Sequence, residues 1–519
     1  MNSRFFYLLI FFVLLVVPIL KGGESTIPSI KELQTKDSLL IEASTKYSKN
    51  FIHKFILGTH YRNVWSAKTY LPVFKLDSIM GGLTPLKVGG GMQTISIHLV
   101  DSLGRRYVLR SVDKYPSSVL QPIYRTTIIN TLVLDQISAE NPYAPILVAV
   151  LAESAGIYHT NPLYYSLKVE PQLLKLHPDL KNCMVMLEEK PHKSWEGSPI
   201  FDYPKKIINT QQMLSLLISN PEIKIDQMLF LKSRLFDLLI NDWDRHAGQW
   251  NWLLQKDSNQ KILKPLPRDR DNALFLFDDG ILPYLVSRWY GYPKFQSFHS
   301  YYEHVPGLLI NSRFIDPIFL NQLEAADWDT AIDDIINKLP DSIIVQAINH
   351  WPKEIIAIQG EKTAKKLIAR RKQLHKAGKI FYKEINRHLT ILGTDHKDLI
   401  TIERIKDSTR ISLKSDSTGF EYFNRTLSNE VTEEISIYAL DGDDQILIKG
   451  KVTNGITINI IGGNGNDHIT DQSDVADWFK KTIIFDTKSG NTIDFGVEAL
   501  DKTGITSKNM VFYREIENE

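Results

Sequence analysis

Cysteine is almost absent from this chain, which holds one, Cys183, among 519 residues. A single cysteine excludes a framework of disulfides within the chain, although it says little about compartment, since many exported bacterial proteins also lack cystine. Net charge is nearly absent as well, because 61 Lys and Arg stand against 60 Asp and Glu. Without a field of one sign, a nucleic-acid partner is not expected, and any phosphate chemistry is local. The remaining composition, 43% hydrophobic and 23% charged, is that of a globular chain long enough for two or three domains.

Long apolar runs are also missing, with one exception at the amino terminus. Arg4 is followed by an apolar run from Phe5 to Leu20 and then by Lys21, which is the pattern of a secretory signal. The run is shorter than the roughly 20 residues of a membrane span, but no clear small-x-small cleavage site follows it. We therefore expect residues 1–22 to be a signal peptide or a short uncleaved anchor, and the protein to be exported to the periplasm or the cell surface.

A glycine triplet precedes a predicted β-hairpin. Gly89, Gly90 and Gly91 stand just before the string "TISIHLVDSLGRRYVLRS", in which apolar residues alternate on both sides of a turn. Missing side chains let the backbone approach a ligand, although such a triplet is more often a plain turn. Arg110 and Lys114 place cations at the end of the returning strand, which favours a ligand that carries phosphate.

The order of the predicted elements indicates a fold class. After a helical lead-in over 23–49 and the hairpin, residues 122–156 have a helical pattern, and "NCMVMLEEKP" has the pattern of a buried strand that ends in acids including Glu188. A helical half opens with "IDQMLFLKSRLFDLLINDWDRH". This is the order of a two-lobed kinase. We expect an α+β module with a first lobe over 50–190, where Glu188 faces the cofactor, and a helical second lobe over 191–395.

The densest gathering of charge begins at the end of that predicted helix, in "LLINDWDRHAGQWNWLLQKDSNQKILKPLPRDRDNALF". Phosphoryl transfer needs a carboxylate to orient and accept the proton of the attacking hydroxyl, and polar side chains to hold magnesium ions on the phosphates. A loop over 242–251 supplies such groups, and a segment over 267–273 supplies more about 27 residues later. The two segments are therefore the predicted catalytic loop and the predicted metal segment.

The loop string "DWDRHAGQ" resembles the DRHxxN loop of phosphoinositide-type lipid kinases and the equivalent loops of toxin-module (HipA-like), spore-coat and secretory-pathway kinases. The resemblance implies that Asp244 is the catalytic aspartate, that Arg245 and His246 are its catalytic-loop neighbours, and that Gln249 takes the place of the metal-binding asparagine. Gln249 departs from the pattern, because its side chain is longer by one methylene.

The second string, "PRDRDN", resembles the "PWDxD" segment of the spore-coat kinases. The resemblance implies magnesium on Asp271 as first choice and on Asp269 as second. Two departures keep a pseudokinase or a nucleotide sensor open. The strand cation is Arg110 where most kinases use lysine, and no glutamate is well placed as its helix partner, since Glu140 looks too early and Glu153 too late.

A purely structural alternative stays open for the same charged stretch. Acids and bases that lie close together in sequence often form a salt-bridge lattice, here joining a helix end to a hairpin. The residues of such a lattice are Asp242, Asp244, Arg245, Arg268, Asp269 and Arg270.

A wider resemblance covers almost the whole chain after the amino-terminal run. The strings "LGTHYRNVW", "GGLTPLKVGGGMQT", "YVLRSVDK", "NDWDRHAGQWNW", "PLPRDRDNALF", "ARRKQL" and "IYALDGDDQILIKG" are similar to an uncharacterised family of exported proteins of Gram-negative bacteria. In its longer members this region precedes a surface-antigen, BamA-like outer-membrane barrel. The resemblance implies a location in the cell envelope and an outer-membrane barrel protein as partner.

From about residue 395 the sequence changes to short strands and turns, which predicts an all-β module over 396–519, either a sandwich or a short β-solenoid. The string "GGNGNDHIT" over 462–470 fits the calcium nonapeptide of RTX proteins once, whereas that site is built by stacking successive copies. Asp467 and Asn464 are therefore weak calcium candidates. A partial copy places Asp444 23 residues before Asp467.

These observations predict ATP- and Mg²⁺-dependent phosphoryl transfer to a protein or glycan hydroxyl. Asp244 is the predicted base, Asp271 and Gln249 are predicted to hold Mg²⁺, and Arg110 to contact the nucleotide phosphate. The alternative class is a non-catalytic, pseudokinase-type envelope scaffold associated with outer-membrane proteins. ATP is scarce outside the cytoplasm, which favours that alternative.

Overall fold

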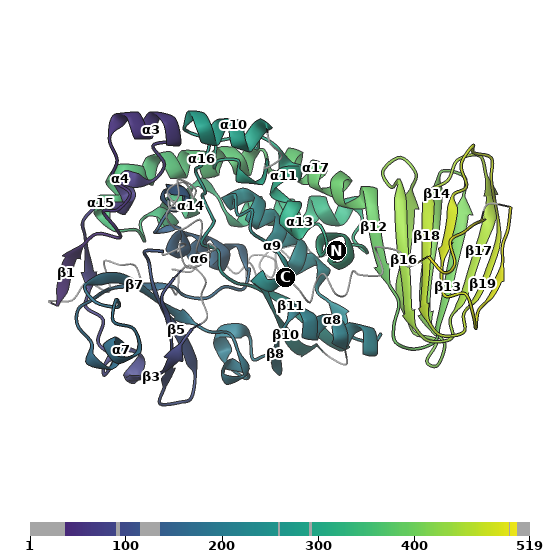
Figure 1. The fold of residues 1–519 in the computed structure, drawn as a ribbon, viewed down its shortest axis with the longest axis horizontal. Coiled ribbons are helices and arrows are strands. Elements are labelled where there is room, and N and C mark those ends of the chain that lie inside the picture. Colours follow the sequence, from purple (N-terminus) through teal and green to yellow (C-terminus); the bar gives the residue numbers. More distant parts are fainter. Residues whose placement is uncertain are drawn as a thin grey trace, which may run out of the picture.

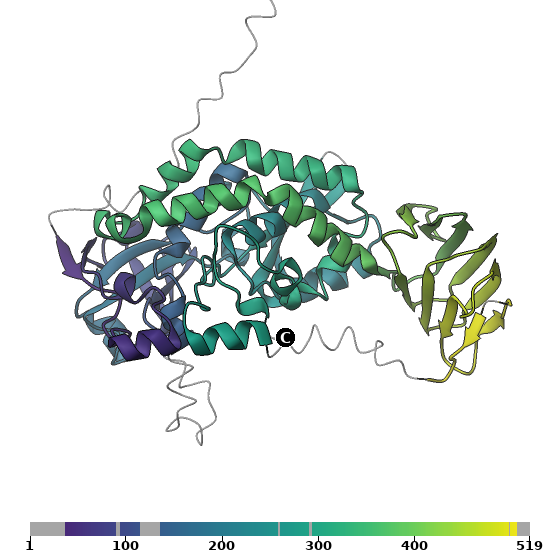
Figure 2. The same ribbon diagram turned by 90° about the horizontal axis from the view of Figure 1, so that it is seen from above.

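The computed structural model describes residues 37–89, 94–114, 135–257, 260–289, 293–497 and 499–505. A two-lobed α+β module occupies one end of an elongated molecule, and an all-β module occupies the other (Figures 1 and 2). The predicted fold class is therefore confirmed. The predicted signal or anchor segment lies outside the described residues, and none of the helices within them is long and apolar enough to cross a bilayer.

The first lobe is built on a five-stranded antiparallel sheet in the order β3-β4-β5-β7-β6. Its strands are β3 (Leu83–Val88), β4 (Ser96–Asp101), β5 (Arg106–Ser111), β6 (Leu163–Leu167) and β7 (Cys183–Glu189). The predicted hairpin is β4–β5. Side chains alternate across it: Ile97, Leu99 and Leu109 are buried in the core, whereas His98 and Arg110 face the second lobe.

The described part of the predicted helical lead-in is a strand, so that prediction was wrong. β1 (Ser38–Ile41) pairs antiparallel with β2 (Thr69–Pro72), and the bridge between Val73 and Ser166 ties this ribbon to β6. Pairing with a distant strand satisfies the backbone of β1, a constraint that local sequence does not reveal. The short helices α3 (Phe51–Leu57) and α4 (Arg62–Trp65) follow.

One helix of the first lobe, α6 (Ala144–Ala155), is apolar on nearly all sides. It packs against the second lobe and ends at Gly156, whose φ of 72° suits a residue without a side chain. The helix predicted over 122–156 is thus confirmed for its last part. Within the described residues, its earlier part contributes a 3₁₀ turn at Ile137–Ala139, and residues 122–134 lie outside them.

The second lobe is mainly helical, as predicted. α7 (Pro171–Leu176) lies between β6 and β7 of the first lobe, and the helices of the second lobe are α8 (Thr210–Ser219), α9 (Gln227–Ile240), α10 (Ile281–Trp289), α11 (Val305–Leu308), α12 (Asp316–Phe319), α13 (Ala325–Lys338), α14 (Asp341–Ile348), α15 (Lys353–Ile355), α16 (Glu361–Lys372) and α17 (Leu374–Arg387). In Figure 2, α16 and α17 run along the molecule toward the all-β module.

The second lobe also holds a four-stranded sheet in the order β8-β10-β11-β9. Its strands are β8 (Lys206–Asn209), β9 (Lys224–Ile225), β10 (Trp250–Asp257) and β11 (Gln260–Pro267). Trp250 and Trp252 of β10 are buried beside Phe230 of α9, with ring centroids 4.7 and 5.7 Å from it. Aromatic packing therefore fixes the β10–β11 hairpin against the helix that leads into the predicted catalytic loop.

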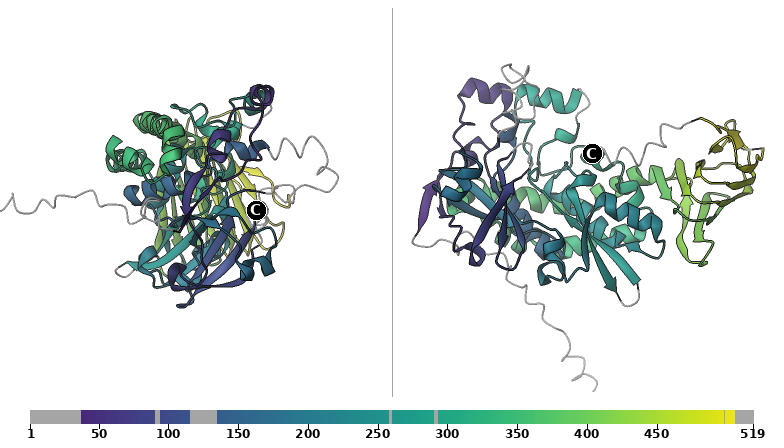
Figure 3. Two further views of the ribbon diagram at one scale, coloured as in Figure 1. Left: turned by 90° about the vertical axis from the view of Figure 1, so that its left-hand side faces the viewer. Right: turned by 60° about the horizontal axis from the view of Figure 1, so that its bottom comes forward.

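Of the two arrangements predicted for the all-β module, the β-solenoid is the one observed. The chain winds between two sheets, in the orders β12-β16-β18-β20-β22 and β15-β14-β13-β17-β19-β21 (Figures 1 and 3). Pairing is parallel except in the hairpins β13–β14 and β14–β15. The strands are β12 (His388–Leu392), β13 (Asp398–Ile405), β14 (Ser408–Ser415), β15 (Glu421–Ser428), β16 (Glu434–Asp441), β17 (Gln445–Val452), β18 (Thr457–Asn464), β19 (His468–Val475), β20 (Thr482–Phe485), β21 (Thr492–Asp494) and β22 (Ala499–Asp501).

The predicted boundary between the modules lies too late. α17 ends at Arg387, and β12 begins at His388 and pairs with β16, so the solenoid begins before residue 395. The strand follows the helix without a turn residue, which is why the helical pattern seemed to continue through it.

A ladder of side chains joins the rungs of the solenoid. The carboxylate of Asp444 accepts a hydrogen bond from the backbone N–H of Asp398 at 2.7 Å, and that of Asp467 accepts one from the N–H of Asp444 at 2.9 Å. The side chain of Asn491 accepts one from the N–H of Asp467 at 2.8 Å. Asn464 donates to a carboxylate of the preceding rung at 2.8 Å. The 23-residue spacing is thus the length of a rung, and the calcium site stays an untested prediction.

Candidate functional site

A cleft of about 670 Å³ lies between the two lobes of the α+β module. Seven of the predicted site residues line it. From the first lobe these are Arg110, Lys114 and Glu188, and from the second lobe Asp244, Gln249, Asp269 and Asp271.

The β10–β11 hairpin brings the loop and the metal segment together. Trp250, near the end of the predicted loop, pairs with Pro267, the first residue of the metal segment. The backbone N–H of Arg268 donates to the carbonyl of Gln249 at 2.9 Å, which continues that register. Two segments separated in sequence therefore face the cleft side by side.

The carboxylate of Asp244 is held by amides. Its Oδ1 accepts a hydrogen bond from Asn311 at 2.7 Å, and its Oδ2 accepts one from Asn272 at 3.4 Å. Among the described residues Asp244 forms no ion pair, whereas Asp269 and Asp271 both do. Asp244 is therefore oriented without being neutralised, as a base requires.

Arg110 bridges the two lobes across the cleft. Its guanidinium lies 2.7 Å from Glu188 on the neighbouring strand and 3.2 Å from Asp269 of the metal segment. Asp269 has a φ of 52°, so its backbone is in the left-handed region, which non-glycine residues rarely adopt. Burial opposes ionisation of Asp269, but the charges of Arg110 and Lys114 outweigh it and lower the pKa of this carboxyl.

Lys114 has the glutamate partner that the sequence did not reveal. Its ammonium lies 2.5 Å from Glu140 and 3.5 Å from Asp271. Glu140, which lies too early in the sequence to be the expected helix partner of Arg110, does not pair with Arg110; it follows a 3₁₀ turn, lines the cleft and pairs with Lys114 instead. Burial raises the pKa of Glu140 to about 6, and burial together with the charge of Asp269 raises the pKa of Asp271. A lysine held by a glutamate beside a metal-segment aspartate is the arrangement found in protein kinases.

Arg245 and His246 do not line the cleft, contrary to the prediction that they take part in catalysis. The Arg245 side chain is fully buried and donates to the carbonyl of Arg268 at 2.7 Å, so it fastens the loop to the metal segment. The Nδ1 of His246 accepts a hydrogen bond from the N–H of Gly248 at 3.1 Å, and its ring borders a separate small pocket. Both residues shape the loop instead of contacting its ligand.

A salt-bridge lattice is present as well, but its centre is a residue that the sequence did not single out. The buried carboxylate of Asp237 on α9 lies 3.1 Å from Arg234, 3.3 Å from Arg245 and 3.0 Å from Arg270. Asp242 completes it, 3.5 Å from Arg245, and burial raises the pKa of Asp242 to about 7. The available signal was an Asp and an Arg three residues apart within an apolar helix, where charges must be paired.

The two hypotheses for the charged stretch therefore each describe part of it. Asp242, Arg245 and Arg270 belong to the buried lattice, whereas Asp244, Asp269 and Arg268 face the cleft. The lattice fixes the loop to α9, and the other three residues line the cleft.

Of the glycine triplet, Gly89 is described, and Gly90 and Gly91 lie outside the described residues. The N–H of Gly89 donates to the carbonyl of Ser96 at 2.7 Å. A Cβ at Gly89 would lie 2.2 Å from the Ser96 hydroxyl, so a larger residue here would force the Ser96 side chain to move.

The cleft suits a divalent cation. The side chains of Asp244, Asp271 and Gln249 offer the oxygen ligands that Mg²⁺ prefers. Burial, followed by the charge of Asp269, raises the pKa of Asp271, and a divalent cation bound there would favour its charged form. These residues fit the predicted metal, and Asp269 fits it less well because Arg110 already pairs with it.

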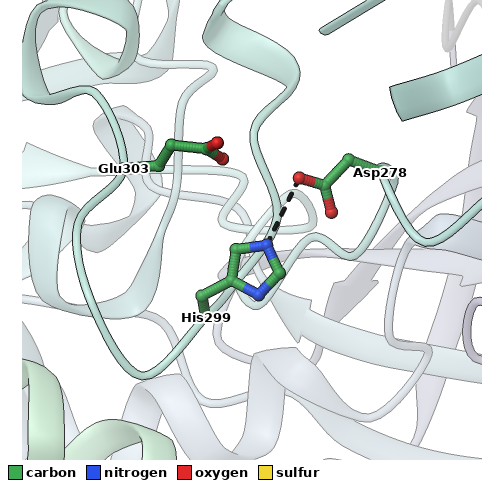
Figure 4. A group of neighbouring side chains, drawn as sticks. All are labelled: Asp278, His299 and Glu303. Atoms are coloured by element: carbon green, nitrogen blue, oxygen red, sulfur yellow. Dashed lines mark hydrogen bonds and ion pairs between the residues drawn. The ribbon is translucent and has the colours of Figure 1, made fainter. Parts of the chain in front are cut away.

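A second cluster of metal-ligating residues lies outside the cleft lining. Asp278, His299 and Glu303 offer ligand atoms within 4.8 Å of one another, and His299 approaches Asp278 at 3.2 Å (Figure 4). Arg288 forms ion pairs with both carboxylates. The positive charge that a metal would bring is therefore already supplied by a side chain.

Comparisons with known proteins leave the family open. No family model and no curated protein matches the sequence. Among solved structures, the Helicobacter pylori proinflammatory kinase CtkA matches at 13% identity, covering 57% of this chain and 96% of its own, with a TM-score of 0.31.

Two further structures match at 10% identity and a TM-score of 0.27, each covering 60% of this chain. They are HipA of a Shewanella oneidensis toxin–antitoxin system, over 77% of its length, and the Rio2 kinase of Chaetomium thermophilum, over 80%. The kinase-like character of the module rests on its strand order and its cleft, since likenesses this distant add no weight.

Proposed function

We propose that this chain is a kinase-like phosphotransferase that transfers a phosphoryl group from Mg²⁺-bound ATP to a hydroxyl of a protein or glycan. One observation carries the proposal. Asp244, Gln249 and Asp271 line one cleft, opposite a lysine that a buried glutamate holds in place.

The roles follow from the contacts. Asn311 and Asn272 orient Asp244, which accepts the proton of the attacking hydroxyl. The hydroxyl oxygen forms the new bond to the γ-phosphorus while the bond from that phosphorus to the leaving ADP oxygen breaks. Asp271 and Gln249 hold Mg²⁺, which supplies charge neutralisation along the phosphates. Lys114 and Arg110 contact phosphate oxygens from the first lobe.

A scaffold without turnover is the second candidate, and a specific contact favours it. Arg110 bridges Glu188 and Asp269 across the cleft, so a ligand has to displace or share this bridge. Gln249 in place of asparagine also changes the reach to the metal.

We further propose that the protein acts in the cell envelope, in the periplasm or at the cell surface, beside an outer-membrane barrel protein. Two features of the sequence support this location: the apolar run at the amino terminus, and the resemblance of strings along the rest of the chain to a family of exported proteins. Fractionation of cells that express the tagged full chain tests this location, and recovery in the cytoplasm would contradict it.

The test of the chemistry is a thermal melt of the wild type and two variants with and without Mg²⁺ and ATP. We expect Mg²⁺ and ATP to raise the melting temperature of the wild type but not of Asp271→Asn, because the variant loses a metal ligand and keeps its shape. Asp244→Asn should retain the rise and lose phosphate transfer, measured with radiolabelled ATP.

The matched control is Asp407→Asn, which removes a carboxylate that is 80% exposed in the solenoid. It should behave as the wild type in both assays. No rise in the wild type, together with much lower melting of both cleft variants, would favour the scaffold.

A further inference from the structure

The charge of the cleft changes sign along its length. At the inner end the cations Arg110 and Lys114 face five carboxylates, from Glu140, Glu188, Asp244, Asp269 and Asp271. At the outer end the lining residues His98, Lys190 and Arg268 are basic. The excess negative charge at the inner end therefore favours a metal cation, and the positive charge at the outer end favours an anion.

The outer group is held by the sheet. The Nζ of Lys190 lies 2.8 Å from the Nε2 of His98, and its backbone N–H donates to the carbonyl of Arg106 at 2.9 Å. His98 pairs with Val108 on β5, two residues outward from Arg110. At about 3.4 Å per residue, the outer group lies roughly 7 Å along the strand from the inner cations, a distance that one small molecule spans.

Within the described residues, neither Lys190 nor Arg268 forms an ion pair with a carboxylate. The two carboxylates whose charge acts on Arg268 are Asp269 and Glu188, and both already pair with Arg110, at 3.2 and 2.7 Å. Burial and neighbouring cations, Arg268 first among them, lower the pKa of Lys190 to about 8. Keeping several positive charges close together in a half-buried cleft costs free energy, which a bound anion would offset.

The pKa of the His98 ring is shifted by the same group of positive charges. Burial, followed by the charges of Lys190, Lys87, Arg106 and Arg110, lowers the pKa of His98 to about 4. The imidazole is therefore neutral at pH 7 and available as a hydrogen-bond donor or acceptor beside the two cations.

We propose that His98, Lys190 and Arg268 form a subsite for a phosphate group at the outer end of the cleft. Lys and Arg side chains bind phosphate through charge-assisted hydrogen bonds, and the neutral imidazole adds one more. The subsite itself rests on these contacts alone. The identity of its ligand rests on the proposed function: with the transferred phosphates on the inner cations, the outer phosphate belongs to a phosphorylated acceptor, or to a nucleotide that, unlike ATP, carries a second phosphate on its ribose.

Calorimetric titration with inorganic phosphate, without Mg²⁺ and without nucleotide, tests the subsite. Lys190→Met should weaken binding about tenfold, since it removes a charge-assisted hydrogen bond, and it leaves the backbone bond to Arg106 in place. The matched control is Lys193→Met, an exposed lysine on the same segment that does not line the cleft. Equal binding by Lys190→Met and the wild type would overturn the proposal.

The same titration separates this proposal from the proposed function. Asp271→Asn, which should lose Mg²⁺-dependent ATP binding, should still bind inorganic phosphate as the wild type does. Phosphate binding that depends on Lys190, in a wild type that shows no response to Mg²⁺ and ATP, would keep the subsite and reject the kinase assignment.

Two probes identify the source of the phosphate. If it belongs to the nucleotide, adenosine 3′,5′-bisphosphate should bind more weakly to Lys190→Met than to the wild type, whereas adenosine monophosphate should not. If it belongs to the acceptor, glucose 6-phosphate should show that dependence instead. The subsite is overturned if neither probe depends on Lys190.

Discussion

The ammonium of Lys114 lies 2.5 Å from the carboxylate of Glu140 and 3.5 Å from that of Asp271. Glu140 thus keeps the lysine from pairing fully with the carboxylate that is proposed to hold metal. With Glu140→Gln we expect Lys114 to move onto Asp271, and phosphate transfer to fall by about tenfold or more, as for loss of a charge that positions substrate. Single-turnover kinetics with labelled ATP measure the change.

The control for that experiment is Glu153→Gln on α6, which makes the same change at the other glutamate considered from the sequence and does not line the cleft. It should leave transfer within twofold of the wild type, because surface changes away from a site have small effects. Equal losses in the two variants would indicate a general effect on the first lobe.

Asp237 should matter for stability more than any cleft aspartate. It pairs with three buried arginines, and Asp237→Asn leaves Arg270 without its carboxylate partner, whereas Arg234 keeps Asp316 and Arg245 keeps Asp242. We expect a loss on the order of 3 to 5 kcal/mol in the free energy of unfolding, as for breaking a buried pair. Urea denaturation followed by tryptophan fluorescence gives this value.

Asp244→Asn is the comparison for that loss, since Asp244 has no ion pair among the described residues and lies in the cleft. Its free energy of unfolding should stay close to that of the wild type. A large loss of unfolding free energy in Asp244→Asn and a small one in Asp237→Asn would contradict the assignment of Asp237 as the centre of the lattice.

The stability of the solenoid should depend on pH through Asp444. Burial, with the charges of Asp398 and Asp467, raises the pKa of Asp444 to about 8, far above the usual value for an unfolded chain. The folded state therefore keeps a proton that the unfolded state loses, so stability is greatest at low pH and falls as pH rises from about 4 to 8.

Asp444→Asn keeps the oxygen that accepts the hydrogen bond from Asp398 and cannot ionise, so it should flatten this pH dependence. Thermal melts at a series of pH values check the slope. Asp474→Asn, which removes a partly exposed carboxylate paired with Lys451, should leave the slope unchanged.

Arg425 should couple the two modules. Its buried guanidinium donates to the carbonyl of Asn321 at 2.7 Å and to the side chain of Asn386 at 2.8 Å, both in the second lobe. Arg425→Met leaves two buried acceptors unpaired, at a cost of about 1 to 3 kcal/mol. Calorimetry should then resolve two transitions in place of a joint one. Arg410→Met, an exposed change on the neighbouring strand, should not separate them.

Much of the fold could be predicted because it depends on local pattern and order. Alternation defined the β4–β5 hairpin, and the two charged strings identified the aspartates of the cleft. What the sequence could not supply was side-chain direction. Arg245 and Asp244 are adjacent, yet one points into the lattice and the other into the cleft, and that choice depends on Asp237 and Asn311, distant partners that no local pattern names.

The same limit explains Glu140 and the module boundary. Glu140 pairs with Lys114 at the end of a 3₁₀ turn that the sequence does not mark, so sequence distance alone did not reveal the pair. His388 begins a strand directly after a helix residue, and only its pairing with β16 identifies it as part of the solenoid.

The direct passage from α17 to β12 has a mechanical meaning. A joint without linker residues offers no freely rotating bonds, so the solenoid turns with the helix that carries it. α17 packs against α13, where Gly378 leaves room for Ile332, and against α9, and α9 leads into the loop of Asp244. A force on the outermost rung of the solenoid is therefore transmitted through α17 and α9 to the loop that carries Asp244 in the cleft.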